Sequence, residues 1–321
     1  MPVLALDARD CASPLFLVRM WALLCGCLTF SLVASLEPWQ LGNTRHHPQH
    51  DPQHDPQHNP RQDPRQQRRH CTFWIACMFT WCFFFTLTLL IHVLNVIRFY
   101  SLLPVSWKNL TVTVAVLGAL MTLSASVLFP WMVTEHLSPR PLAATVASCL
   151  TVLAYCGEVW VIRGQSQEHR GYMASLPGIL KILQCWGGCQ MIPLFVERIA
   201  AANAGELHAG EQAWPLWVSV GLYNVCLLMS LASIAVILCD CTGRCPFPFH
   251  RLLAGFSLLG VVFYMVTTVL CVTNVLQLYK QVNTDGSELA IMETVIVSIT
   301  LLAYTVDFSF SIKQLCERGH G

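Results

Sequence analysis

Apolar residues gather into eight long runs, separated by shorter stretches rich in charged residues, proline and glycine. Crossing the hydrocarbon core of a bilayer takes about 20 apolar residues in a helix that rises about 1.5 Å per residue. Only helices and closed barrels satisfy their own backbone hydrogen bonds in lipid, and runs of this length favour helices. The pattern therefore predicts eight transmembrane helices, at residues 15–36, 72–96, 110–133, 142–162, 179–200, 214–238, 252–276 and 289–312.

Composition agrees with an all-α integral membrane protein. Hydrophobic residues fill 55% of the 321 positions and charged residues 12%, whereas soluble domains carry roughly 25% charged residues. The formal net charge of +1 gives no basic face for nucleic acid, which we exclude as a partner. The first run is longer than the core of a signal peptide and follows Asp7 and Asp10, so we expect it to be retained as a helix.

The chain carries an internal repeat. Leu153-Ala154-Tyr155 shortly precedes Glu158, and Leu302-Ala303-Tyr304 precedes Asp307 at the same spacing. The first and fifth runs also begin alike, since each follows a proline and has a basic residue in its first turns. The prolines, Pro14 and Pro177, are farther apart along the chain than the leucines of the paired signatures. The second copy is therefore shorter, by about the length of a histidine-rich repeat tract in the first.

The repeat predicts two tandem four-helix units. We expect a tail at residues 1–14, a first unit at 15–162, a linker at 163–176, a second unit at 177–312 and a tail at 313–321. Lys and Arg number eleven on the side of the two tails and three on the other side, if five arginines of the first loop are set aside. Because basic residues favour the cytoplasmic side, this bias predicts that both termini are cytoplasmic.

The first loop, at residues 37–71, contains the repeat tract, made of tetrapeptides of the kind His-Asp-Pro-Gln. Proline at every fourth position is incompatible with a regular helix, so we expect a solvated, disordered segment. Its histidines, His46, His47, His50, His54 and His58, could bind a transition metal. The prolines prevent them from sharing a helix face, which favours the interpretation as a spacer, and no metal site is predicted.

Ionisable residues inside the membrane are the first candidates for function. Glu158 and Asp307 are predicted at the same depth as Arg19 and Lys181, near the cytoplasmic interface. In a four-helix unit the first and last helices have these ends on one side of the membrane. We therefore predict structural ion pairs between Arg19 and Glu158 and between Lys181 and Asp307. A proton or cation relay is the alternative, but it requires ionisable groups that reach the midplane.

The chain has 16 cysteines without a repeated zinc spacing. Cys239, Cys241 and Cys245 follow the sixth run closely, beside basic residues, and juxtamembrane cytoplasmic cysteines favour S-palmitoylation. Ordinary free thiols are the alternative interpretation. No catalytic residue and no cofactor-binding residue is predicted.

Several short segments resemble a known family: FSLVAS at 30–35, FTWCF at 79–83, LSAS at 123–126, GYMA at 171–174 and PGILK at 177–181. With the paired Leu-Ala-Tyr signatures, they are similar to the myeloid-associated differentiation marker family over residues 14–311. The His-Asp-Pro-Gln tract departs from the family pattern, which favours a divergent paralogue. The resemblance implies two tandem MARVEL domains in a plasma-membrane protein linked to cholesterol-rich domains, junctions and cortical actin.

These observations favour a non-enzymatic organiser of membrane domains, which packs laterally against lipids, itself or other membrane proteins. A small-solute or ion transporter is the alternative, because paired repeats are common in transporters. The two copies each have an even number of helices and therefore run parallel, without the broken midplane helices of many transporters. An enzyme is disfavoured, because no cluster of His, Cys or carboxylate groups is predicted at one depth.

Overall fold

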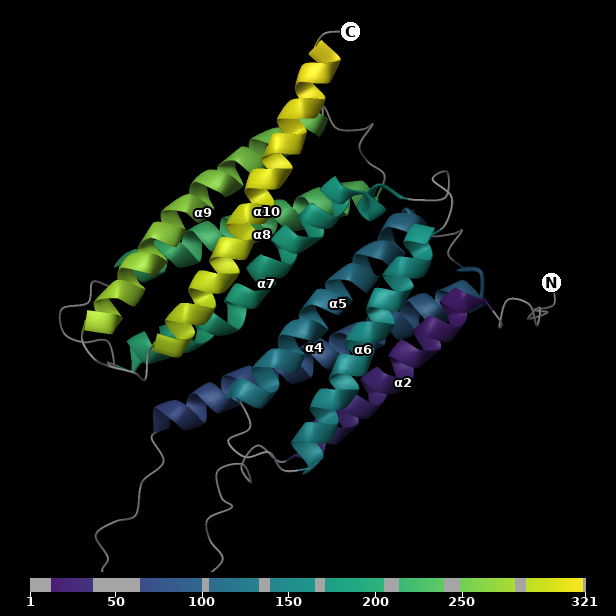
Figure 1. Cartoon of the computed structure of the whole chain (residues 1–321), viewed down its shortest axis with the longest axis horizontal. Coiled ribbons are helices and arrows are strands. Elements are labelled where there is room, and N and C mark those ends of the chain that lie inside the picture. Colours follow the sequence, from purple (N-terminus) through teal and green to yellow (C-terminus); the bar gives the residue numbers. More distant parts are fainter. Residues whose placement is uncertain are drawn as a thin grey trace, which may run out of the picture.

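The computed structural model of the chain describes residues 13–36, 64–99, 104–132, 139–164, 171–204, 214–239, 249–280 and 287–319. Within these ranges eight helices are long and apolar enough to cross a membrane, and no strand occurs (Figure 1). A short 3-10 turn, η3 (Tyr172–Ala174), precedes the fifth of them. The all-α membrane fold predicted from the hydrophobic pattern is thus confirmed. The eight helices are α2 (Pro14–Ala34), α4 (Pro64–Val96), α5 (Trp107–Met132), α6 (Pro139–Gly164), α7 (Leu176–Asn203), α8 (Trp214–Leu238), α9 (Phe249–Lys280) and α10 (Ser287–Gly319).

Two helices extend farthest beyond the predicted runs. α4 begins at Pro64, so residues 64–71 are helical and their assignment to a disordered loop was wrong. Proline fits the first turn of a helix, where its missing amide has no partner to lose, and α4 contains no proline after it. α10 continues to Gly319, through most of the segment expected to be a tail. Residues 37–63, with the histidine repeat, lie outside the described residues.

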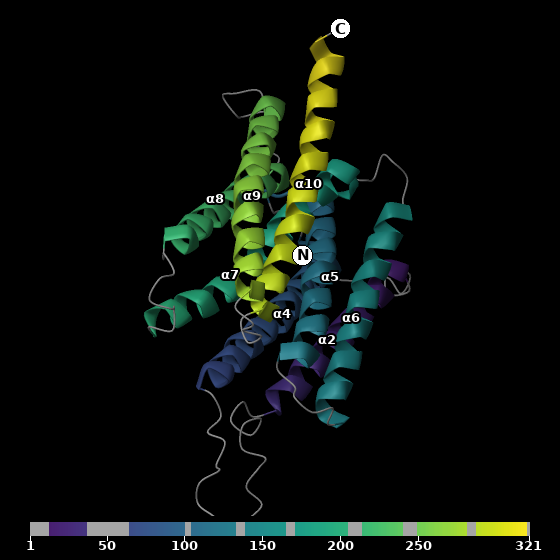
Figure 2. The same cartoon turned by 60° about the vertical axis from the view of Figure 1, so that its left-hand side comes forward.

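The helices form two four-helix bundles with the same order of contacts (Figures 1 and 2). In the first bundle α2 packs against α4 and α6, and α5 closes the ring between them. In the second bundle α7 packs against α8 and α10, and α9 closes the ring. The first helix of each bundle therefore lies beside the last one, which brings the basic residues of α2 and α7 close to the acidic residues of α6 and α10.

The two bundles join along α4, α5, α7 and α8, and the junction is polar at several levels. The indole N–H of Trp186 donates to the hydroxyl of Ser124 at 3.0 Å. At one end of the junction the side-chain oxygen of Asn109 accepts the backbone N–H of Met173 in η3 at 3.1 Å. Buried apolar residues of both bundles belong to one continuous core cluster. The two bundles thus share a packed and hydrogen-bonded boundary.

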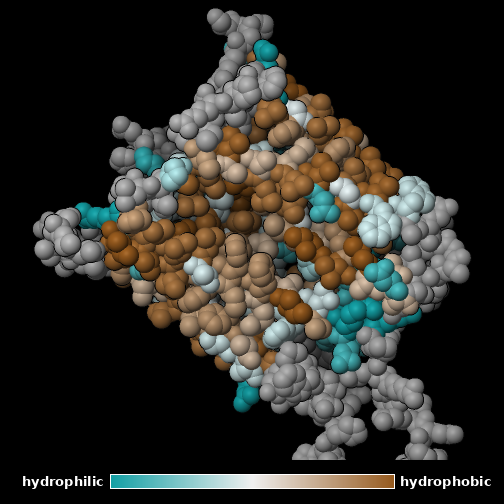
Figure 3. Space-filling model, turned by 180° about the vertical axis from the view of Figure 1, so that it is seen from behind, coloured by the Kyte–Doolittle hydropathy of each residue, from teal (hydrophilic) through white to brown (hydrophobic). Residues whose placement is uncertain are grey.

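Apolar side chains dominate the outer surface of the described helices. Figure 3 shows a broad hydrophobic face, with hydrophilic residues gathered mainly at its edges. Leu153 and Leu302, which hold equivalent positions in the two bundles, are 65% and 64% exposed, and Trp160 is 79% exposed. Such a surface is unfavourable in water and suits contact with lipid chains.

Candidate functional site

The first candidate pair lies between the first and last helices of the first bundle. Nε of Arg19 is 2.6 Å from Oε1 of Glu158, and both side chains are almost fully buried. Ser13 caps α2 by accepting the backbone N–H of Phe16, and Pro14 starts the helix. This local structure places Arg19 in the second turn, on the face that α2 packs into the bundle.

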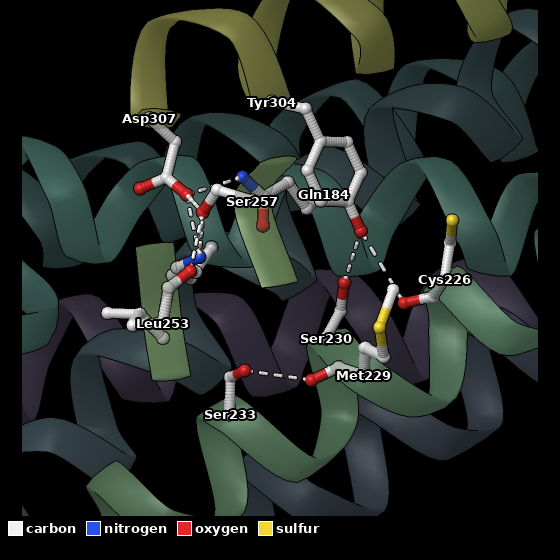
Figure 4. Close-up of polar contacts among 10 residues, drawn as sticks. Gln184, Cys226, Met229, Ser230, Ser233, Leu253, Ser257, Tyr304 and Asp307 are labelled. Carbon is white, nitrogen blue, oxygen red and sulfur yellow. Dashed lines mark hydrogen bonds and ion pairs between the residues drawn. The ribbon is translucent and has the colours of Figure 1, made fainter. Parts of the chain in front are cut away.

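The second candidate pair lies at the corresponding place in the second bundle. Nζ of Lys181 is 2.6 Å from Oδ2 of Asp307. Ser175 caps α7 by accepting the backbone N–H of Gly178, so Lys181 also enters in the second turn. The ammonium of Lys181 donates to the Ser257 hydroxyl at 3.0 Å, and the amide of Gln184 donates to Asp307 at 3.1 Å. Figure 4 shows Gln184, Ser257 and Asp307 converging from α7, α9 and α10.

A buried tyrosine stands one turn before each acidic residue. The hydroxyl of Tyr155 lies 2.8 Å from the hydroxyl of Thr88 and donates to the carbonyl of Phe84 at 3.3 Å. The hydroxyl of Tyr304 lies 2.8 Å from that of Ser230 and donates to the carbonyl of Cys226 at 3.4 Å (Figure 4). The two tyrosines therefore make the same pair of contacts with α4 and α8.

These contacts fix the register of the internal repeat. Both tyrosines also pack their rings against a glycine, on α5 in the first bundle and on α9 in the second. Three pairs of equivalent contact residues are the same number of residues apart along the chain: Thr88 and Ser230, Phe84 and Cys226, and Gly118 and Gly260. Arg19 and Lys181 are separated by more residues than these three pairs. Glu158 and Asp307 are also separated by more residues, but the excess is smaller. The second bundle thus has the shorter connection after its first helix and the longer one before its last.

The two sites differ in how completely their polar atoms are satisfied. In the first site Nη1 of Arg19 is buried and has no hydrogen-bond partner among the described residues. In the repeat register, the positions of Gln184 and Ser257 are occupied there by Ala22 and Ala115. The first site thus has the larger guanidinium of Arg19 and alanines at the two equivalent positions. The second site has the smaller ammonium of Lys181, with an amide and a hydroxyl at these positions.

Two further ion pairs, which were not predicted from the sequence, lie at the opposite ends of the helices. Glu197 accepts the Nε–H of Arg68 at 3.1 Å and the hydroxyl of Thr72 at 3.0 Å, which links α7 to α4 across the junction. Arg198 lies 2.5 Å from Glu293, which links α7 to α10. The adjacent charges Glu197 and Arg198, late in an apolar run, were the available signal. Their partners could not be assigned without knowing how the bundles join.

Of the three cysteines predicted to be palmitoylated, one is among the described residues. Cys239 is exposed at the end of α8, and Cys241 and Cys245 lie outside the described residues. Cys239 therefore stands where the chain leaves the predicted span.

The bundles of apolar helices with buried ion pairs define a multi-pass membrane protein. The MARVEL family, described as a membrane-associating domain, matches residues 10–161, which include most of the first bundle. No solved structure matches the chain.

Comparisons over most of the chain place it more narrowly. The chain is 30% identical over 335 residues to the myeloid-associated differentiation marker of Rattus norvegicus, and the match covers 96% of this chain and 92% of that protein. Identity to the protein of the same name in Homo sapiens is 31% over 276 residues, covering 84% and 73%. The Xenopus laevis homolog is 27% identical over 330 residues, covering 94% and 93%. The chain belongs to the myeloid-associated differentiation marker family, and these identities fit the predicted divergent paralogue.

Proposed function

We propose that this protein is a non-enzymatic organiser of membrane domains, which acts by packing laterally against lipids and other membrane proteins. The observation that supports this function is the pairing of the buried carboxylates with basic side chains. Glu158, Glu197, Glu293 and Asp307, buried in the described helices, each contact a basic side chain. A transporter needs ionisable groups that exchange partners during its cycle, whereas closed pairs and an apolar outer surface suit a passive scaffold.

Reconstitution of the full chain tests this function against the transporter alternative. Proteoliposomes containing the protein should show no proton or ion flux above that of protein-free vesicles. In cells the protein should partition with cholesterol-rich, detergent-resistant membranes, and proximity labelling from its C-terminus should recover other membrane proteins and cortical components. Specific flux that Glu158→Gln or Asp307→Asn abolishes would contradict the scaffold function.

We further propose that the pairs Arg19–Glu158 and Lys181–Asp307 act as struts that hold the first and last helices of each bundle together. An unpaired charge at a helix centre costs about 2.5–3.5 kcal/mol on insertion scales, and less near the interface. Pairing at 2.6 Å removes much of this cost, and it does so only when the two helices are correctly packed. The pairs would thereby favour one arrangement of the helices.

The second bundle is proposed to be a second MARVEL-type domain, over the expected residues 177–312 and the continuation of α10 to Gly319. Supporting this assignment, the contacts of Tyr304 repeat those of Tyr155, and both bundles have the same ring of helix contacts. A separately expressed segment of residues 171–321 should insert and assemble with a segment of residues 1–164. Failure of two co-expressed segments to associate would count against two distinct units.

The proposed location is the plasma membrane, with both termini in the cytoplasm and with cholesterol-rich lipid as the preferred surroundings. The bias of Lys and Arg along the chain supports this orientation. Epitopes placed at each terminus should be detected only after cells are permeabilised. Detection of either epitope on intact cells would overturn the orientation.

Palmitoylation of Cys239, Cys241 and Cys245 is proposed as an additional anchor to ordered lipid. The exposure of Cys239 at the end of α8 supports it, because an acyl chain there would enter the adjacent leaflet. Hydroxylamine-sensitive acyl exchange should label the wild-type protein and lose signal when the three cysteines are changed to serine. Equal labelling of both proteins would exclude acylation at these positions.

A further inference from the structure

A strongly polar side chain lies on the lipid-facing surface close to the middle of a membrane-spanning helix. Asn224 is the eleventh of the 25 residues of α8, and it is exposed. At a rise of about 1.5 Å per residue it lies about 3 Å along the axis from the midpoint of the helix. From this depth a short asparagine side chain cannot reach the water at either interface.

The helix itself satisfies only part of this side chain. Nδ2 of Asn224 donates to the carbonyl of Val220 at 2.8 Å. A primary amide has two N–H donors and a carbonyl acceptor, so one N–H and the carbonyl oxygen still require partners. The exposed hydroxyls of Ser298 and Thr305 on α10 differ, because each donates its single proton to a carbonyl of its own helix. In hydrocarbon an unsatisfied polar group is costly, which favours a partner for Asn224 outside the chain.

The exposed residues around Asn224 have the spacing of a helix-pairing seam. Exposed positions recur at intervals of four and three residues, the pattern of a left-handed pair of helices. Gly221, one turn before Asn224, would have no atom within 4 Å of an added Cβ, so it leaves room for a close approach of another backbone. The exposed seam consists of Trp217, Gly221, Asn224, Leu228, Leu231 and Ala235.

The first bundle lacks this feature. In the register fixed by the tyrosine contacts, Cys82 on α4 is equivalent to Asn224, and Phe79 is equivalent to Gly221. Both residues are exposed, but neither combines a strong hydrogen-bonding group with a small neighbour. Of these two equivalent outer positions, only the one in the second bundle therefore has an amide side chain.

We infer that this face of α8 is the interface of a symmetric dimer of the chain, in which the two Asn224 amides hydrogen-bond to each other. Two copies inserted in one membrane share the same orientation, so a two-fold axis along the membrane normal sets α8 parallel to the partner's α8. In a parallel pair each seam residue meets its own counterpart. An amide is its own complement, because its N–H donates to the other carbonyl and its carbonyl accepts in return.

This inference rests on the proposed lateral packing function and names its first partner, a second copy of the chain. It is tested with the full-length protein, labelled at the C-terminus with a donor or an acceptor fluorophore and reconstituted in phosphatidylcholine vesicles at several protein-to-lipid ratios. Energy transfer is compared for wild type, Asn224→Leu and the control Ser298→Leu. Within one chain the described bond of Asn224 is to its own helix, so in dilute detergent, where the protein is monomeric, Asn224→Leu should melt at the same temperature as wild type.

Energy transfer in the wild type should exceed that of randomly placed molecules, and Asn224→Leu should need about a tenfold higher protein density to reach the same level. Ser298→Leu should match the wild type. A mixture of wild-type donor and Asn224→Leu acceptor should associate no better than Asn224→Leu alone, because one amide then faces leucine. Wild-type transfer at the random level, or transfer unchanged by Asn224→Leu, would overturn the dimer. If the dimer is overturned but Asn224→Leu still partitions into cholesterol-rich membranes, the proposed organiser function is retained.

Discussion

The two bundles have one architecture and two different interiors. At the predicted cytoplasmic end, an arginine and a glutamate beside two alanines in the first bundle correspond to a lysine and an aspartate beside Gln184 and Ser257 in the second. The longer charged side chains thus go with the smaller neighbours, and the shorter ones with additional polar neighbours. Close packing favours such a compensation, because a longer charged side chain leaves less room for its neighbours.

The opposite ends of the bundles differ more strongly. In the repeat register, Trp81, Phe129 and Ala144 of the first bundle correspond to Tyr223, Cys271 and Glu293 of the second. Trp81 packs edge-on against Phe129, whereas the hydroxyl of Tyr223 lies 3.6 Å from the thiol of Cys271. The first bundle also has polar groups here, since the indole N–H of Trp81 donates to the Ser148 hydroxyl at 2.9 Å. The same helix arrangement is therefore compatible with neutral polar groups in one bundle and with the buried charge of Glu293, paired with Arg198, in the other.

Removing both acidic partners should have the largest effect on stability. Breaking a buried ion pair typically costs about 3–5 kcal/mol, because the remaining charge is left uncompensated. The double variant Glu158→Gln with Asp307→Asn should therefore lose surface expression, measured by flow cytometry of a tagged protein. Between the single variants, Glu158→Gln should lower the melting temperature more, because Lys181 keeps the Ser257 hydroxyl. Normal expression of the double variant would exclude a structural role for the pairs.

Substituting alanine for the glycines that contact the tyrosine rings should have the second-largest effect on stability, and the effect should differ between the bundles. An added Cβ at Gly260 would overlap the ring of Tyr304, whereas at Gly118 it would lie 3.2 Å from the ring of Tyr155. Overpacking costs about 1–3 kcal/mol, so Gly260→Ala should approach the upper value and Gly118→Ala the lower one. Gly255→Ala, with no neighbouring atom within 4 Å, is the matched control. Thermal denaturation in detergent gives the ranking, and equal losses at all three sites would contradict the packing difference.

The contact between Arg68 and Glu197 tests how strongly the bundles are joined. Arg68→Gln removes a charged partner from a buried carboxylate that keeps the hydroxyl of Thr72. A hydrogen bond to a charged group contributes about 1.5–3 kcal/mol, and partial exposure of Arg68 favours the lower end. We expect a melting transition that is lower and broader, because the bundles unfold less cooperatively. Lys313→Gln, which breaks an exposed pair with Glu317, should leave the transition unchanged.

Substituting phenylalanine for the two tyrosines should have the smallest effect, and it should be similar in both bundles. Tyr155→Phe and Tyr304→Phe each remove one hydroxyl from matching contacts, at a typical cost of about 0.5–1.5 kcal/mol. Stability curves of the two single variants should nearly coincide. A loss in one variant and none in the other would contradict the equivalence of the two sites.

The number of helices and their approximate positions along the chain were the parts of this architecture that the sequence could predict. The eight helices follow from the pattern of apolar runs, because the bilayer sets the length of a spanning helix. The acidic and basic residues late or early within these runs are read directly from the same sequence. The start of α4 at Pro64 was missed because the polar turns before Thr72 have no apolar period. Ser257 and Gln184 were missed for another reason, since a hydroxyl or an amide in a helix reveals its partner only when the neighbouring helix is known.

The boundary between the bundles imposes a mechanical property on the whole molecule. The bundles are joined by polar contacts at three levels. These are the Asn109–Met173 hydrogen bond at one end, the Trp186–Ser124 hydrogen bond within the boundary and the Arg68–Glu197 pair at the other end. Together they resist rotation of one bundle relative to the other. The eight helices should consequently diffuse as a single stiff inclusion of fixed outline. Neighbouring lipids and proteins would then meet a surface whose outline stays the same as the molecule moves.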